Sequence, residues 1–252
     1  MPTDRTEFLG IRFDPLSESE VIERLRSVTA DTTFGYIVTP NVDHIVRLSH
    51  VQSELEIEAA YTKAAMCVCD SRVLALLARL RGIRLPVVTG SDLTAALLES
   101  ELKPGDRAAV VGGSDDLIER LSARYSHVEF VHHLPPMGLK HNVAAQTLAA
   151  EFIAEAKCRF TFLAVGSPQQ ELIAARVVGG TGFGLCIGAA LEFLTGDQVR
   201  APKVMRRTGL EWAHRLASDP RRLWRRYLID GPRVFLLAWR WRASSADNGR
   251  SA

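Results

Sequence analysis

The stretch from Phe160 to Glu171 constrains the fold of this chain more than any other segment. Residues 160–165 are apolar or β-favouring and are too few to form a helix, so they predict a buried strand. Gly166 follows directly and lets the backbone turn sharply, because glycine has no side chain to restrict it. The sequence therefore predicts a strand that ends in a tight turn.

The residues after this turn have the pattern of a helix start. Ser167 is a favoured N-cap residue, Pro168 suits the first helical position, and Gln170 lies at the capping-box spacing from Ser167. In an open parallel sheet, ligands bind at such a junction, and the free N–H groups of the helix suit phosphate. An ordinary strand–turn–helix corner has the same spacing, but the polar cluster Gln169-Gln170-Glu171 favours a functional site.

Strand and helix patterns alternate through residues 1–199. The expected strands are residues 8–13, 36–38, 65–69, 107–111, 128–132, 160–165 and 184–188. This alternation predicts an α/β fold, a Rossmann-like, mostly parallel sheet with helices on both faces. We expect residues 200–243 to form a basic, tryptophan-containing helical appendage and residues 244–252 to be disordered.

The composition is that of a globular cytoplasmic protein. The 252 residues are 47% hydrophobic, yet no apolar run approaches the ~20 residues that a membrane span needs. The N-terminus lacks the apolar core of a signal peptide. Four cysteines, without the spacing of a zinc site, suit buried positions in a reducing compartment.

Positive charge is concentrated at the C-terminal end. Residues 200–252 hold 13 Arg and Lys against 4 Asp and Glu, and all four tryptophans lie there too. Basic residues mixed with tryptophan suit an anionic membrane surface. Two alternatives remain open: the tryptophans could pack on the core, or the basic segment could make this a nucleic-acid-binding α/β protein.

Polar residues and glycines follow the expected strands. They are Thr39, Asn41, Asp70, Gly112, Gly113, Gly166 and Gln170. Because the carboxyl ends of parallel strands meet at one edge, we expect these residues to gather there. Asp70 ends a strongly apolar strand, so it could cap the following helix or act as a general base that faces the crevice.

A second group of glycines resembles a dinucleotide-binding motif but fails its requirements. Gly179, Gly180, Gly182 and Gly184 precede a strand, whereas that motif must follow a strand and open a helix. The sequence therefore predicts no nicotinamide site, and we expect no cofactor.

Read together, the strand ends and the basic segment resemble a known family. The chain is similar to the WecG/TagA/CpsF glycosyltransferases across roughly residues 8–230. The matching pieces are Thr39-Pro40-Asn41, Asp70, Thr89-Gly90-Ser91-Asp92-Leu93, Gly112-Gly113, Gly166 to Glu171, Arg200-Ala201-Pro202, Gly209-Leu210-Glu211-Trp212, Arg215, Pro220-Arg221-Arg222 and Arg226-Tyr227. The family usually has glycine after the strand-ending Asp, where this chain has Ser71.

The resemblance implies an inverting, metal-independent hexosyltransferase in surface-polysaccharide or teichoic-acid-type synthesis. The donor would be a UDP-sugar of the N-acetylmannosamine type or a related hexose. The acceptor would be a sugar carried on polyprenyl diphosphate. The enzyme would then lie at the inner face of the plasma membrane, bound peripherally to anionic lipid. We expect no nucleic-acid partner, and a homo-oligomer is left open.

The chemistry of such a transfer assigns roles to particular residues. Asp70 would take the proton of the acceptor hydroxyl. The chain has no Asp-x-Asp pair, so backbone N–H groups and arginines would stabilise the departing diphosphate. The predicted binding residues are Thr39, Asn41, Gly112, Gly113, Pro136, Gly166, Gln170, Glu171, Arg200, Arg215, Arg221 and Arg222.

Overall fold

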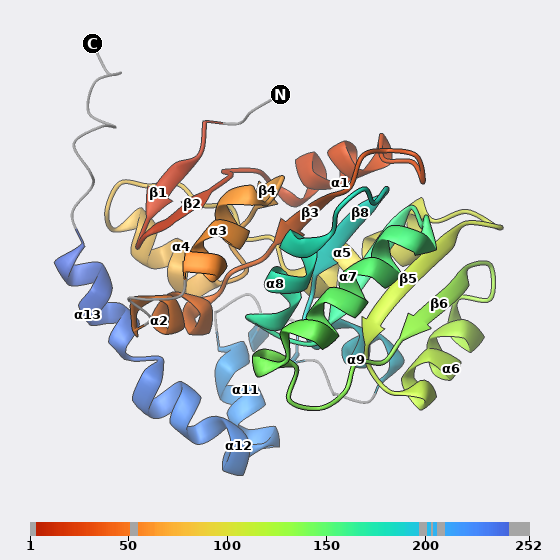
Figure 1. Cartoon of the computed structure of the whole chain (residues 1–252). Coiled ribbons are helices and arrows are strands. Elements are labelled where there is room, and N and C mark those ends of the chain that lie inside the picture. Colours follow the sequence, from red (N-terminus) through yellow and green to blue (C-terminus); the bar gives the residue numbers. More distant parts are fainter. Residues whose placement is uncertain (1–3, 51–54, 197–200, 203, 206–209, 242–252) are drawn as a thin grey trace.

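A six-stranded parallel sheet forms the centre of the molecule, as the sequence predicts (Figure 1). The computed structural model describes residues 4–50, 55–196, 201–202, 204–205 and 210–241. The strand order is β4-β3-β8-β7-β5-β6, and every pair of neighbours is parallel. The strands are β3 (Gly35–Val38), β4 (Met66–Cys67), β5 (Arg107–Gly112), β6 (Glu129–His133), β7 (Phe160–Ala164) and β8 (Phe183–Cys186).

Helices cover both faces of this sheet, and each face has its own apolar cluster. One face is covered by α2 (Val42–His50), α3 (Leu55–Lys63), α4 (Arg72–Arg79), α7 (Val143–Ala156), α8 (Gln169–Arg176) and α13 (Arg233–Arg240). The other is covered by α1 (Glu18–Arg26), α5 (Gly90–Ala96), the π-helix η1 (Leu97–Glu101), α6 (Asp115–Arg124) and α9 (Ala190–Thr195). Alternate residues of one strand serve opposite faces: Ile37 packs with the second cluster and Val38 with the first.

The order of the strands creates a crevice between β3 and β8. The helix that follows β3, α2, lies on one face, and the helix that follows β8, α9, lies on the other. Because these helices diverge, the space above the carboxyl ends of the two strands is left open. The same divergence occurs between β7 and β5, whose following helices are α8 and α6.

Two local predictions from the sequence are wrong. Residues 8–13 form an antiparallel hairpin, β1 (Thr6–Phe8) and β2 (Ile11–Phe13), instead of one strand. Leu9 and Gly10 both take positive φ, which is the geometry of a tight two-residue hairpin turn. Ser17, in contrast, caps α1 through a full capping box, as its position predicts.

The second error concerns the start of α8. Ser167 does not cap this helix; Pro168 occupies the N-cap position, and no side chain bonds to the first turn. The carbonyl oxygen of Ser167 instead accepts a hydrogen bond from the guanidinium of Arg47, and Gly166 takes a φ of +76°. The turn after β7 is therefore held by contacts with α2, and the helix begins at Gln169.

The C-terminal helices form a layer that we call the C-terminal layer. It comprises α11 (Glu211–Ser218), α12 (Pro220–Trp224), the π-helix η3 (Arg225–Asp230) and α13. In Figure 1 its helices are blue: α11 and α12 lie below the sheet, on the side toward which the arrows of β5 and β6 point, and α13 lies at the left. Val234 and Ala238 of α13 are buried in the first apolar cluster, so the layer is packed on the body.

Hydrogen bonds from the segment after α4 also hold this layer. A terminal nitrogen of Arg81, which lies just after α4, donates to the carbonyl oxygens of Ala238 and Trp239 at 2.7 and 2.6 Å. Trp241 packs edge-on against Phe8, with ring centroids 5.2 Å apart. The tryptophans of this layer therefore have different environments: Trp241 packs against the core, whereas Trp239 is 74% exposed to solvent.

Candidate active site

A cavity of about 1220 Å³ lies between the carboxyl ends of the strands and the C-terminal layer. Its walls come from the loops after β3, β4, β7 and β8, from the start of α5, and from α11 through α13. The crevice that the strand order creates is thus covered by a segment more than a hundred residues away from β3 in sequence. Residues from four strand ends can act on one bound molecule there.

Six of the predicted site residues line this cavity. They are Thr39, Asn41, Asp70, Gly166, Gln170 and Arg215. Five others lie outside its lining, within the part of the chain that the structure describes: Gly112, Gly113, Pro136, Glu171 and Arg221. Arg200 and the side chain of Arg222 lie outside the described residues. The edge of the sheet at which the sequence predicts the site therefore carries this cavity, and the structure brings about half of the predicted residues together on its wall.

Asp70 is the acidic group at the end of β4. Its neighbour Ser71 is the N-cap of α4 and accepts a hydrogen bond from the backbone nitrogen of Leu74, so Asp70 is not needed as a cap. The Oδ2 atom of Asp70 accepts a hydrogen bond from the Gly90 nitrogen at 3.2 Å. The sequence leaves open whether Asp70 caps α4 or faces the crevice. The structure shows that Ser71 caps this helix and that the carboxyl of Asp70 lies on the cavity wall.

The surroundings of Asp70 suit a general base. Burial raises the pKa of this carboxyl to about 7, with the Gly90 hydrogen bond and the charge of Arg215 acting in the opposite direction. Glu211, on α11, adds to the increase. A base whose pKa lies near neutral pH combines a useful ionised fraction with a strong drive to accept a proton.

Arg215 is the cation of the C-terminal layer that faces Asp70. Its guanidinium lies 4.9 Å from the ring centroid of Phe193 and donates to Glu211 at 3.0 Å. Both contacts hold the long side chain over the cavity, where its charge lowers the pKa of Asp70. A fixed guanidinium beside an acid is suited to binding an anion during a reaction.

Three further arginines line the cavity and are not among the predicted site residues: Arg47, Arg72 and Arg226. One carboxylate, that of Asp43 on α2, pairs with Arg47 at 2.7 Å and with Arg226 of η3 at 3.4 Å. The four-residue spacing of Asp43 and Arg47 predicts only an ion pair on the surface of a helix. Arg226 stands out in the sequence only as part of the family-like motif Arg226-Tyr227, and its pairing with the distant Asp43 has no local signal.

Thr39 and Asn41 have structural partners as well as positions on the cavity wall. The hydroxyl of Thr39 donates to the carbonyl oxygen of Cys186 at 3.1 Å and so ties the end of β3 to the end of β8. The side-chain oxygen of Asn41 accepts from the nitrogen of Asp43 at 3.0 Å, which shapes the start of α2. Each residue thus supports the loop that lines the cavity.

The glycine pair after β5 serves a tight turn. Gly112 and Gly113 have φ values of +92° and +77°. A Cβ atom on Gly112 would lie 2.6 Å from Val165 and 3.0 Å from the backbone of Ala164. The pair therefore lets β5 and β7 end side by side, and it lies outside the cavity lining.

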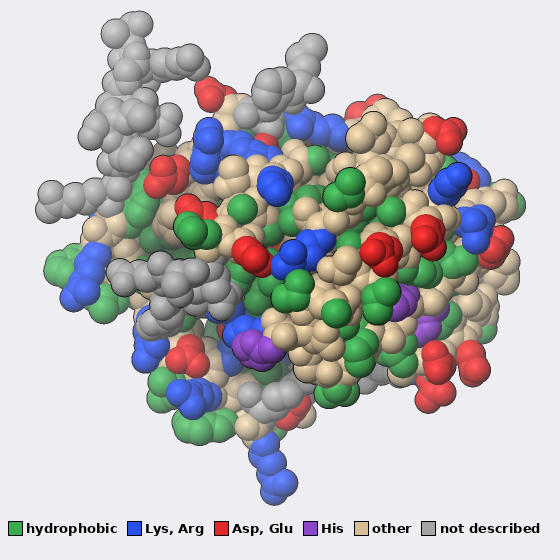
Figure 2. Space-filling view, in the orientation of Figure 1, with side chains coloured by type: hydrophobic (Ala, Val, Ile, Leu, Met, Phe, Trp, Pro, Cys, Tyr) green, Lys and Arg blue, Asp and Glu red, His purple; other side chains and the backbone are tan. Residues whose placement is uncertain are grey.

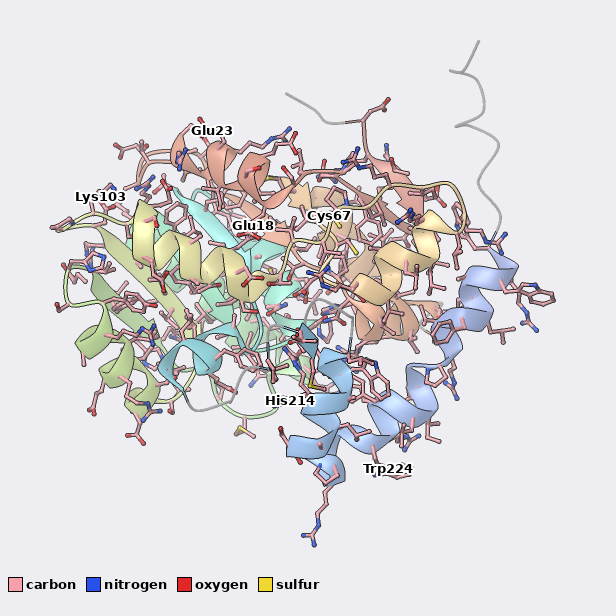
Figure 3. All side chains as sticks on the ribbon, turned by 180° about the vertical axis from the view of Figure 1, so that it is seen from behind. Glu18, Glu23, Cys67, Lys103, His214 and Trp224 are labelled. Carbon is pink, nitrogen blue, oxygen red and sulfur yellow. The ribbon has the colours of Figure 1, made fainter. Side chains whose placement is uncertain are left out.

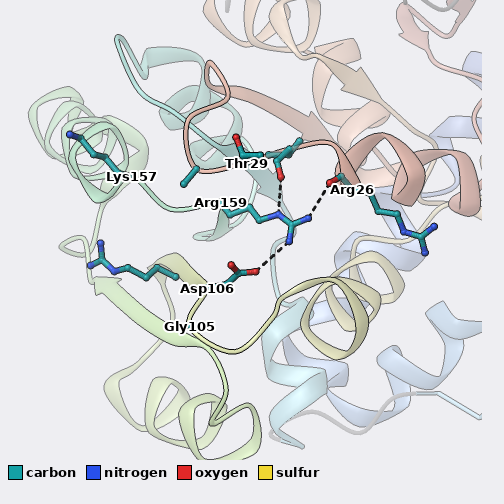
Figure 4. Close-up of a pocket in the computed structure, with 9 residues that line it drawn as sticks. Arg26, Thr29, Gly105, Asp106, Lys157 and Arg159 are labelled. Atoms are coloured by element: carbon teal, nitrogen blue, oxygen red, sulfur yellow. Dashed lines mark hydrogen bonds and ion pairs between the residues drawn. The ribbon is translucent and has the colours of Figure 1, made fainter.

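A second, smaller cavity of about 420 Å³ lies at the opposite edge, where β5 and β7 begin (Figure 4). It contains several basic side chains, but Arg159 at its centre is bound by the protein itself. Its guanidinium donates to the carbonyl oxygens of Val28 and Glu101, each at 2.8 Å, and to Asp106 at 3.3 Å. This arginine joins three separate segments of the chain, so we assign the cavity a structural role.

Across the described residues, no helix is both long and apolar enough to cross a membrane. Among these described residues, there is also no group of three or more His, Cys, Asp or Glu side chains that could hold a metal ion.

The fold and the cavity place an acidic side chain, that of Asp70, at the carboxyl edge of a parallel α/β sheet. The sequence matches the model of the glycosyl transferase WecG/TagA/CpsF family over residues 6–248, nearly the whole chain. The chain therefore belongs to this family and is a glycosyltransferase. The match also confirms the family resemblance that the motifs indicate.

Proposed function

We propose that this enzyme transfers a sugar from a UDP-sugar to a sugar carried on polyprenyl diphosphate, with inversion at the anomeric carbon. The observation that carries the proposal is the placement of Asp70, a carboxyl with a pKa of about 7, in a cavity of about 1220 Å³. This volume exceeds that of an ordinary small-ligand pocket, and it suits two sugars and a nucleotide together.

The proposed reaction is a single displacement. Asp70 takes the proton of the acceptor hydroxyl, and the oxygen forms a bond to the anomeric carbon of the donor. The bond from that carbon to the diphosphate breaks, and the electron pair leaves with UDP. Because attack and departure occur on opposite faces of the sugar, its configuration inverts. The sequence offers no Asp-x-Asp pair, so this route assigns no step to a metal.

Arg215 is the residue that we assign to the departing diphosphate. It lies on the cavity wall in the C-terminal layer, with its guanidinium held by Glu211 and Phe193. Charge-assisted hydrogen bonds from a guanidinium fit phosphate oxygens closely. Thr39, Asn41 and Gln170 supply polar groups for the donor, of N-acetylmannosamine type or a related hexose, and for the acceptor.

A thermal-shift experiment tests the donor class. A ligand present at 100 times its dissociation constant stabilises a protein by about 2.7 kcal/mol, which raises the melting temperature of a chain of this size by roughly 5–10 °C. We expect UDP and UDP-sugars to give this increase, while GDP and single-stranded DNA do not. If UDP has no effect and the DNA stabilises the protein, the alternative of a nucleic-acid-binding protein replaces the proposal.

The acceptor lipid requires contact with a membrane, and the C-terminal layer offers a suitable surface. Exposed apolar side chains on this layer include Trp224, Leu228, Phe235, Leu236 and Trp239. Figure 2 shows green and blue side chains intermingled over α12 and α13 at the lower left, and Trp224 lies at the outer rim of the layer in Figure 3. We propose that this surface rests on anionic lipid at the cytoplasmic face of the membrane.

Replacement of two side chains on α13 tests this surface. We expect the double variant Phe235→Ser and Trp239→Ser to bind anionic vesicles at least ~10-fold more weakly, because each side chain contributes roughly 1–2 kcal/mol of apolar burial. Vesicle co-sedimentation measures the change. Met137→Ser is the matched control, because Met137 is 98% exposed but lies in the loop after β6. Equal loss in the control, or none in the double variant, would contradict the assignment.

A further inference from the structure

Glu171 is a buried acid that lies outside the cavity lining, and the basic side chain beside it, His44, is 3.9 Å away. Glu171 is 1% exposed, and its Oε2 atom has no hydrogen-bond partner among the described residues. Burial raises the pKa of this carboxyl, while contacts with Gln170 and Ser167 and the charge of Arg47 act in the opposite direction. A buried carboxyl with an unsatisfied oxygen weakens a fold, so its presence calls for a role other than stability.

The side chain of Gln170 connects Glu171 to the cavity. The Oε1 atom of Gln170 accepts from the Gly188 nitrogen at 2.8 Å, and its Nε2 atom donates to Oε1 of Glu171 at 2.9 Å. The backbone N–H of Gly188 can only donate, and the carboxylate can accept, so the amide of Gln170 has one orientation. Its Nε2 carries a second hydrogen, and Gln170 lines the cavity.

His44, which lies in α2, completes this arrangement. Its Nδ1 atom accepts from the Asn41 nitrogen at 2.9 Å, which places the ring proton on Nε2, 3.9 Å from Oε1 of Glu171. Burial lowers the pKa of His44 to about 3, so the ring is neutral. Glu171 therefore lies between two donors, Nε2 of Gln170 at 2.9 Å and Nε2 of His44 at 3.9 Å, and α2, α8 and the loop after β8 come together beside the cavity.

We propose that Glu171 is a positioning residue that holds the amide of Gln170 with its nitrogen toward the cavity, so that Gln170 donates a hydrogen bond to an oxygen of the sugar nucleotide. This inference rests on the proposed function for the identity of the ligand. It replaces the direct substrate contact predicted for Glu171, because the side chain lies beneath the cavity surface instead of on it.

Substitutions at Glu171 separate positioning from a structural role. In Glu171→Leu the acceptor for Gln170 is lost, and we expect the KM for the UDP-sugar to rise about tenfold with kcat changed less than threefold. Glu171→Gln keeps an oxygen that accepts from Gln170, so its KM should return close to the wild-type value. Neither variant should melt at a lower temperature, because each removes a buried ionisable group.

Glu101→Gln is the matched control. Glu101 is also buried, but it pairs with Arg26 at 3.0 Å, near the opposite edge of the sheet. We expect this variant to melt at a lower temperature and to keep the wild-type KM. A parallel fall in melting temperature and affinity in Glu171→Leu, or a KM for Glu171→Gln no better than that of Glu171→Leu, would overturn the proposal.

A double-mutant cycle tests whether Glu171 acts through Gln170. We expect Gln170→Leu to raise the KM for the UDP-sugar, and the addition of Glu171→Leu to raise it no further. Independent, additive effects would show that Glu171 acts by another route.

Hydrogen exchange tests the positioning role of Glu171 without a substrate. In protein labelled with ¹⁵N, the side-chain Nε2 protons of Gln170 should exchange at least tenfold faster in Glu171→Leu than in wild type. Unchanged exchange would overturn the positioning role. If wild type binds no UDP-sugar while exchange responds as expected, the proposed function fails and the orientation of Gln170 stands.

Discussion

Replacement of Asp70 by Asn is expected to lower turnover by roughly 10²–10⁴-fold and to stabilise the protein at neutral pH. The loss of rate follows because the amide cannot take the proton of the acceptor hydroxyl. The gain in stability follows because the carboxyl of Asp70 has a pKa of about 7 in the folded protein, against an ordinary value of 3.8. One substitution should therefore move activity and stability in opposite directions.

The sign of the stability effect comes from proton binding. The folded protein holds the Asp70 proton more tightly than the unfolded chain, so this contribution to stability is complete below about pH 4 and is lost as pH rises through 7. Wild type should lose roughly 2–4 kcal/mol over this range, and Asp70→Asn should not. Urea unfolding at several pH values measures the difference between the two proteins.

The pH dependence of turnover is an independent measurement of the ionisation of the Asp70 carboxyl. Wild-type turnover should rise with pH to about 7 and then level off, because the base must be ionised. Asp116→Asn is the control, since Asp116 is an exposed acid in the first turn of α6. A constant stability difference across pH, or substantial activity in Asp70→Asn, would remove Asp70 from the proposed role.

Arg215→Gln is expected to lower kcat by roughly 10²–10³-fold, as the loss of a group that stabilises developing charge does in other enzymes. The matched control is Arg221→Gln. Arg221 belongs to the same C-terminal layer but is exposed and outside the cavity lining, so its variant should retain nearly full activity. Steady-state kinetics with the UDP-sugar measures both variants.

A second signature distinguishes Arg215 from a merely structural residue. Its positive charge lowers the pKa of Asp70, whereas Glu211 raises it. Residual activity of Arg215→Gln should therefore show a pH midpoint above that of wild type, and Glu211→Gln should show one below it. If Arg215→Gln and Arg221→Gln lose activity equally, or if the midpoint does not move, the diphosphate assignment is wrong.

The parts of the fold that the sequence predicts well are those that local pattern determines. Apolar runs such as residues 107–111 and 160–165 form strands because they are too short for helices and too apolar for the surface. Asp70 stands out because a single acid ends such a run. The parallel arrangement then brings the strand ends together without further information from the sequence.

The features that the sequence does not reveal depend on distant contacts. Ser167 has the spacing of a cap, but contacts from α2 decide where α8 begins. The burial of Glu171 depends on how α8 rotates against the sheet, and nothing in the run Gln169-Gln170-Glu171 distinguishes the residue on the cavity wall from the one beneath it. The pairing of Asp43 with Arg226 joins segments far apart in the chain.

The two hydrogen bonds from Arg81 to α13 have a mechanical consequence. Arg81 is two residues beyond the end of α4, and α4 begins two residues after Asp70. A shift of α13 relative to the body must either break both bonds or carry α4 with it. A pull exerted at the outer surface of α13 is thus transmitted along one helix to the loop that holds the acid.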